Sequence, residues 1–292
     1  MATQSTSKLK ADRERKLRSV ITFASSLEQR IRVDPADAIL LSDIQDHLKP
    51  LPLEPSAEIA PKRDQLERQG TTLWNLSTRL HRQASLDNGH SNSKLVCILR
   101  AFACMILESA RPQRTTPALA GTIKLQKVAL KAARSCIDQT QLELGIKVLE
   151  RAAIHVEELE KLSQNEGFLD DDERVCIRLR VEYFMLRTLL HWKQQRLDLA
   201  NHFFNQSGVA EYTLDGETAE MFADILLEIG QDQFRSKAFD AAVQWLERAH
   251  DLIDRQDRDD LSPDAADLHM CISSYFSMFR HFNTANNCFD NF

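Results

Sequence analysis

Apolar residues recur at helical spacing along nearly the whole chain. Residues 12–31 carry apolar side chains on one face of a helix, with charged residues between them, and this pattern predicts an amphipathic helix. The same periodicity predicts further helices at residues 37–48, 63–83 and 95–110, and a pair of helices within residues 122–162. The helix at 95–110 is apolar on nearly every side, so we expect it to lie in the centre of the fold.

Small residues in the segment 227–253, LEIGQDQFRSKAFDAAVQWLERAHDLI, have the spacing that lets two antiparallel helices pack closely. Gly230 of the first helix is expected to face Ala242 and Ala249 of the second. These are positions eight, twenty and twenty-seven of a tetratricopeptide (TPR) unit. A bulky side chain at Ala242 would overpack the crossing at a cost of about 1–3 kcal/mol. The segment therefore indicates a binding scaffold.

The same template fits other parts of the chain, and a regular series is typical of a repeat protein. Position twenty falls at residues 145, 200, 242 and 285, which are 55, 42 and 43 residues apart, longer than the ~34 residues of a standard TPR. The residues expected to pack these crossings are Ala133, Gly145, Ala152, Ala200, Gly230, Ala242, Ala249 and Ala285.

We therefore predict an all-α fold, a TPR-like α-solenoid of antiparallel helix pairs preceded by an N-terminal helical arm. The expected divisions are a basic, amphipathic arm over residues 1–48, a linker over 49–62 with four prolines, and the repeat domain over 63–292. The last repeat reaches position twenty-seven only at Phe292. Since solenoids need a polar terminal cap, we expect the chain to be an N-terminal fragment of a longer protein.

Charge and hydropathy narrow the class of function. A net charge of −6 disfavours direct nucleic-acid binding, which depends on neutralising phosphates. Residues 1–16 contain no apolar core, so we expect no secretory signal. The longest apolar stretch is shorter than the ~20 residues of a membrane span. Basic residues gather near residues 8–18, but Asp12 and Glu14 interrupt them, which favours a solvated helix end over a nuclear-import signal.

The sequence contains no motif that predicts catalysis. There is no GxSxG, no phosphate-binding glycine loop and no kinase signature. The six cysteines have no CxxC pair, and the nine histidines form no HExxH motif. We predict buried thiols, no metal, no cofactor and no catalytic residue.

A TPR array binds partners along a concave groove lined by the first helix of each pair. The candidate groove residues are Lys127, Lys131, Arg134, Met185, Leu189, Trp192, Gln231 and Phe234. The three cations lie on one helical face and could take an acidic peptide. Leu186 stands where chaperone-tail-binding TPRs carry an amide, so a carboxylate clamp is disfavoured. The alternative is that the cations are only solvated and that Trp192 and Phe234 pack against neighbouring helices.

Several segments in order resemble the meiosis-specific TPR scaffold family of the Zip-four and sporulation type, in the ZMM group. The segments are LWNLSTRL (73–80), RAFACMILESA (100–110), IKVLERAA (146–153), FADILLEIG (222–230) and AAVQWLERAHDLI (241–253). The resemblance covers roughly residues 63–292. The helix ending in EIG, followed by a helix with WLERA and DLI, looks like the most recognisable part of that family's shared domain.

The resemblance implies a non-enzymatic scaffold in the nucleus, on meiotic chromosomes, that supports homologue synapsis and crossover recombination. It also implies protein partners, namely an XPF-like recombination complex and chromosome-axis or synaptonemal-complex proteins. Two alternatives keep the helical fold. One is a general, cytoplasmic TPR adaptor in a chaperone, transport or ubiquitin-pathway assembly. The other is a helical domain of an enzyme whose catalytic part lies beyond Phe292.

Overall fold

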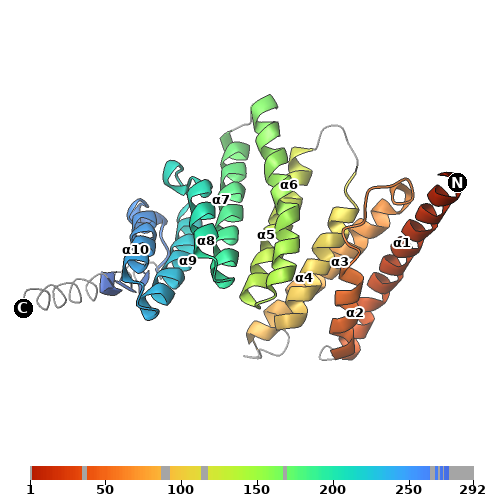
Figure 1. Ribbon diagram of the computed structural model, residues 1–292, viewed down its shortest axis with the longest axis horizontal. Coiled ribbons are helices and arrows are strands. Elements are labelled where there is room, and N and C mark those ends of the chain that lie inside the picture. The colour runs from red at the N-terminus through yellow and green to blue at the C-terminus, as the bar shows by residue number, and fades with distance from the viewer. Residues whose placement is uncertain are drawn as a thin grey trace, which may run out of the picture. The chain divides into compact units, whose positions relative to one another are not determined.

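The computed structural model describes residues 2–34, 38–86, 93–112, 118–166, 170–263, 267–268, 270–271 and 273–275. Every regular element in these residues is a helix, and no strand occurs among them. The predicted all-α fold is confirmed, and the helices pack in pairs as a TPR-like fold requires (Figure 1).

The chain divides into two compact units, Met1–Leu179 and Arg180–Phe292. The first unit contains α1 (Ala2–Val33), α2 (Ala38–Leu48), the 3₁₀ turn η1 (Ala60–Lys62), α3 (Arg63–Leu86), α4 (Ser93–Ser109), α5 (Leu119–Asp138) and α6 (Leu142–Glu166). Helix α7 (Asp170–Lys193) begins in the first unit and ends in the second. The second unit continues with α8 (Leu197–Ser207), η3 (Val209–Glu211), α9 (Gly216–Arg235), α10 (Phe239–Asp254) and η4 (Arg258–Asp260).

The core of the first unit is built around α4, which packs against both α3 and α5. Every side chain of α4 from Leu95 to Ser109 is buried except Arg100, as its all-round apolar pattern predicts. Helices α1 and α2 lie against α3 and α4. Lys147 of α6 also donates a hydrogen bond of 2.7 Å to the carbonyl of Leu48 at the end of α2. The N-terminal helices are therefore part of the first compact unit, which extends to Leu179 within α7.

Two helix pairs approach closely at positions where a glycine leaves room for its neighbour. A Cβ added at Gly230 of α9 would lie 2.9 Å from the side chain of Leu246 and 3.4 Å from the carbonyl of Ala242, both on α10. A Cβ at Gly70 of α3 would lie 2.7 Å from Leu107 of α4. The α3/α4 pair thus has a close crossing of its own, before the first repeat that the spacing indicates.

The turns between α5 and α6, α7 and α8, and α9 and α10 share one geometry. Each contains a residue with a left-handed backbone, with φ of 54° at Thr140, 61° at Gln195 and 62° at Lys237. The next N–H donates to the carbonyl five residues earlier: Gln141 to Cys136 at 2.8 Å, Arg196 to His191 at 2.9 Å and Ala238 to Gln233 at 2.9 Å. This is the Schellman motif, and its recurrence has the same spacing as the small residues. In the fourth predicted repeat, position twenty at Ala285 lies outside the described residues.

We expect the substitution Gly230→Val to lower the free energy of unfolding by about 1–3 kcal/mol, because the added methyl groups would overpack the α9/α10 crossing. The matched control is Gly121→Val on α5, where an added Cβ meets nothing within 4 Å. Its effect should stay below about 0.5 kcal/mol. Urea unfolding followed by far-ultraviolet circular dichroism measures both. Equal stability of the two variants would contradict this account of the crossing.

Candidate functional site

A surface hollow lies along α5 in the first unit, with a volume of about 630 Å³. Its apolar lining includes Trp74 of α3 and Ile123 and Val128 of α5. Three lysines of α5 line it as well: Lys124, Lys127 and Lys131. Asp172 and Val175, near the start of α7, complete it. We call this site the lysine hollow. It contains two of the residues that the sequence predicts for the groove, Lys127 and Lys131.

The helical repeat of α5 separates these lysines from the core. Thr122, Gln126, Ala129 and Ala133 lie on the buried side of the helix, whereas the lysines are exposed. Lys124 forms an ion pair with Glu67 of α3 at 3.3 Å. Lys127 and Lys131 form none within the described part of the chain, and like charges four residues apart destabilise a helix by about 0.2–0.5 kcal/mol. This face of α5 is therefore not arranged for stability alone.

Arg134, the third predicted cation, has a different role. Its Nε donates to both carboxylate oxygens of Asp138, one turn further along α5, at 3.0 and 3.2 Å. Its charge is satisfied along its own helix, and it does not line the lysine hollow. The cations of α5 that line the hollow are thus Lys124, Lys127 and Lys131, of which Lys124 is paired with Glu67. Sequence reasoning missed Lys124, although its place three residues before Lys127 puts it on the same face.

The predicted groove residues of the second unit are mostly core residues. The side chains of Met185, Leu189 and Trp192 are only 0%, 1% and 5% exposed. Trp192 Nε1 also donates to a carboxylate oxygen of Asp232 at 3.0 Å. The middle part of α7 is apolar on several faces, so positions that would line a groove are covered here. These three side chains have no surface to offer a partner.

Gln231 and Phe234 on α9 are half-buried. The ring of Phe234 lies 5.4 Å from that of Phe239 and 5.6 Å from that of Tyr275, in edge-to-face contacts. The second unit therefore shows the packed arrangement that the sequence left as an alternative for Trp192 and Phe234. The described residues predicted to pack the helix crossings are all buried: Ala133, Gly145, Ala152, Ala200, Gly230, Ala242 and Ala249.

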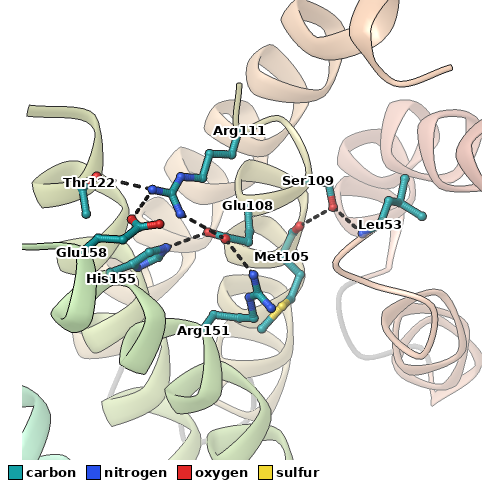
Figure 2. A network of polar contacts seen from close by, with 9 residues as sticks. All are labelled: Leu53, Met105, Glu108, Ser109, Arg111, Thr122, Arg151, His155 and Glu158. Atoms are coloured by element: carbon teal, nitrogen blue, oxygen red, sulfur yellow. Dashed lines mark hydrogen bonds and ion pairs between the residues drawn. The ribbon is translucent and has the colours of Figure 1, made fainter. Parts of the chain in front are cut away.

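A buried polar network joins α4 to α6 beside the first turns of α5 (Figure 2). Glu108 of α4 is 8% exposed and accepts hydrogen bonds from Arg151 at 3.2 Å and from Nε2 of His155 at 2.9 Å. Arg111, just after α4, contacts Glu158 of α6. The same guanidinium lies 3.5 Å from the hydroxyl of Thr122 on α5. These contacts hold the end of α5 that contributes Ile123 and Lys124 to the lysine hollow.

Electrostatics favour the ionised form of Glu108. Burial by itself would raise the pKa of this carboxyl group, but the hydrogen bond from His155 and the charges of His155, Arg151 and Arg111 outweigh it. The pKa of Glu108 therefore lies below its ordinary value of 4.5. Sequence reasoning missed Glu108 and His155. The available signal was a single carboxylate inside an otherwise apolar helix, since a buried charge needs a partner.

The described residues contain no group of three or more His, Cys, Asp or Glu side chains placed to hold a metal ion. Cys97, Cys104 and Cys136 are buried, and burial raises the pKa of Cys104, which keeps it a thiol. In contrast, Cys271 is exposed. Among the described helices, none combines the length and the apolar character that crossing a bilayer requires.

A comparison with protein families finds a similarity within the second unit. Residues 190–278 match the family described as Meiosis protein SPO22/ZIP4 like. This segment of the chain is therefore similar to SPO22/ZIP4-like meiosis proteins. The matched residues include the whole of α8, α9 and α10, with the EIG and WLERA segments. The lysine hollow lies outside the matched SPO22/ZIP4-like segment, in the first unit. No curated protein and no solved structure matches the chain.

We expect Glu108→Gln to lower the free energy of unfolding at pH 7 by about 3 kcal/mol. This is the lower end of the range for breaking a buried ion pair, because Arg111 and Arg151 partly reach solvent. Because the pKa of Glu108 is depressed in the folded state, its contribution is fully present above the ordinary value of 4.5. That contribution is lost as the pH falls through the lower folded value.

Urea unfolding of the wild type and of Glu108→Gln, from pH 7 down to pH 3, measures this difference. The control is Glu157→Gln on α6, whose partner Lys161 lies 4.0 Å away in an exposed pair and whose loss should cost less than about 1 kcal/mol. A stability difference for Glu108→Gln that stays constant below pH 4.5 would count against the depressed pKa.

For Leu189→Ala we expect a loss of about 2–5 kcal/mol in the free energy of unfolding, because the side chain is buried and its removal leaves a cavity. Gln231→Ala, at a half-buried groove position, should cost less than about 1 kcal/mol. Thermal and urea unfolding distinguish the two. If Leu189→Ala proved as stable as the wild type, Leu189 would belong to a surface groove after all.

Proposed function

We propose that this protein is a non-enzymatic protein-interaction scaffold in meiosis. In this role it supports homologous chromosome synapsis and crossover recombination by bridging recombination complexes and chromosome-axis proteins. It acts in the nucleus, on meiotic chromosomes. The single observation that carries the proposal is the SPO22/ZIP4-like domain at residues 190–278, because it ties the helical second unit to a family of meiosis proteins.

The architecture supports the scaffold part of the proposal. Glycine and alanine at the helix crossings let the paired helices pack closely, and the outward faces of the helices stay free to contact a partner. The first unit has such a face on α5, where exposed lysines border an apolar hollow. The second unit instead keeps Met185, Leu189 and Trp192 in its core. We therefore place partner binding in the first unit at the lysine hollow, and in the second at surfaces other than these three side chains.

The proposed partners are an XPF-like recombination complex and chromosome-axis or synaptonemal-complex proteins. Direct contact with nucleic acid is not part of the proposal, since the net charge of −6 opposes it. The competing function is that of a general TPR adaptor in a chaperone, transport or ubiquitin-pathway assembly. Both functions use the same fold, so only the partners separate them.

Affinity purification of the gene product, tagged at its own chromosomal locus in meiotic cells of the source organism, tests the proposal. We expect mass spectrometry to recover XPF-like recombination factors and axis proteins, and we expect deletion of the gene to reduce crossovers and synapsis. An untagged strain and a vegetative culture are the controls. Recovery of chaperone, transport or ubiquitin-pathway subunits, together with normal meiosis in the deletion strain, would refute the meiotic function.

A further inference from the structure

We infer that the lysine hollow is a docking site for an acidic segment of a partner protein that carries an apolar anchor residue between its carboxylates. The inference rests on the proposed scaffold function and adds to it the chemistry of one partner segment. The hollow lies in the first unit, outside the SPO22/ZIP4-like segment at residues 190–278. It is therefore a second functional region of the chain.

The first observation behind the inference is that two lysines on α5 have no carboxylate partner among the described residues. Other cations nearby are neutralised within the structure: Lys124 pairs with Glu67 at 3.3 Å, and Arg134 pairs with Asp138 at 3.0 Å. Lys127 and Lys131 are exposed and four residues apart, and no described carboxylate pairs with either. Two like charges on one helical face repel each other. Carboxylates of a partner would remove that repulsion and form the ion pairs that the chain itself does not supply.

The second observation is that the hollow has apolar surface beside these two lysines. Apolar surface from Trp74, Ile123 and Val128 lies beside the two lysines in a space of about 630 Å³, enough to take one large apolar side chain. Lys127 and Lys131 are one helical turn apart, or about 5–6 Å along one face. Carboxylates at i and i+4 of a helical segment match that spacing, and so do carboxylates at i and i+2 of an extended segment, about 6.8 Å apart.

Asp172 restricts the orientation in which a partner segment could bind. It lines the hollow from α7, so the hollow also contains one carboxylate, on a different helix from the lysines. A partner segment would place its carboxylates along α5 and a neutral or basic side chain toward α7. The same carboxylate opposes a nucleic-acid strand, whose phosphates would approach both walls. The ligand that fits the hollow is thus an acidic protein segment with a neutral or basic side chain on its α7 side.

The hollow is also held in shape before a partner arrives. Helix α5 packs against α4 and α6, and the network around Glu108 and Arg111 fixes its first turns (Figure 2). A rigid site loses little conformational entropy on binding. The free energy of the ion pairs with a partner would therefore contribute to affinity, because it would not be offset by the cost of ordering α5.

The test uses the 292-residue chain and an array of peptides of about 12 residues. Each peptide has a central Leu, Ile, Phe or Trp and two Glu residues four positions apart, and each has a twin with Gln in place of Glu. The strongest binder, labelled with fluorescein, is then titrated by fluorescence anisotropy. We expect the Glu peptide to bind about tenfold or more tightly than its Gln twin. Raising the salt concentration from about 50 to about 300 mM should weaken this binding.

Variants of the chain locate the binding. Lys127→Glu/Lys131→Glu should weaken binding of the Glu peptide about tenfold or more, and Lys127→Gln/Lys131→Gln should weaken it less. Val128→Asp should weaken binding of both twins, because it places a charge in the apolar lining. Lys161→Glu, an exposed lysine on α6 that does not line the hollow, should leave binding unchanged. Circular dichroism and the unfolding midpoint verify that each variant is folded.

The inference is overturned if the Glu and Gln peptides bind equally, or if the folded Lys127→Glu/Lys131→Glu variant binds as the wild type does. It is also overturned if a single-stranded DNA oligonucleotide binds more tightly than the Glu peptide through the same lysines. These results are independent of the purification from meiotic cells. If the peptides fail to bind but the purification still recovers meiotic partners, only this site is rejected. If the Glu peptide binds as expected but the purification recovers non-meiotic partners, only the proposed function is rejected.

Discussion

Close approach between antiparallel helices is the constraint on which the rest of this structure depends. At Gly230 and Gly70, the neighbouring helix occupies the place that a Cβ would need. Alanines at 133, 152, 200, 242 and 249 are fully buried at the other predicted contact positions. Helices packed this closely can bury their apolar faces without large side chains at every contact. A chain of paired helices then forms, with its outward faces free for other roles.

The buried network around Glu108 adds a directional element to that packing. Apolar contacts alone allow helices to slide, whereas a carboxylate with two hydrogen-bonding partners has few acceptable positions. Glu108 joins α4 to Arg151 and His155 of α6, and Arg111 contacts Glu158 and Thr122. The network thereby fixes the end of α5 from which the lysine hollow begins. The core and the candidate binding surface are two sides of the same helix.

The two units contribute differently to the proposed function. The second unit carries the SPO22/ZIP4-like match and keeps most of the predicted groove residues in its core. The first unit lies wholly outside the matched residues and presents Lys127 and Lys131, which no carboxylate pairs with among the described residues. The family match and the proposed binding surface therefore fall in separate parts of the chain. A scaffold that joins several proteins needs separate surfaces of this kind.

The sequence by itself determined the helices and the packing of their pairs. Helical periodicity and the spacing of Gly230, Ala242 and Ala249 are local properties, and a local pattern shows which residues a helix must bury. The central position of α4 followed in the same way from its all-round apolar pattern. The EIG and WLERA segments also carried the family resemblance, because they form one continuous α9/α10 pair.

Only the tertiary structure decided which charges and aromatic rings are accessible. Lys127 and Arg134 have similar positions in the sequence pattern, yet Asp138 neutralises Arg134. The repeat register predicts that Trp192 lies in the groove. Its side chain is instead buried, and its Nε1 donates a hydrogen bond to Asp232. The partners of Glu108 lie 43 and 47 residues away in sequence, so no local pattern predicts them. Exposure and pairing depend on neighbours that folding brings together, and for this reason the repeat register could place a side chain on a helix but could not say what covers it.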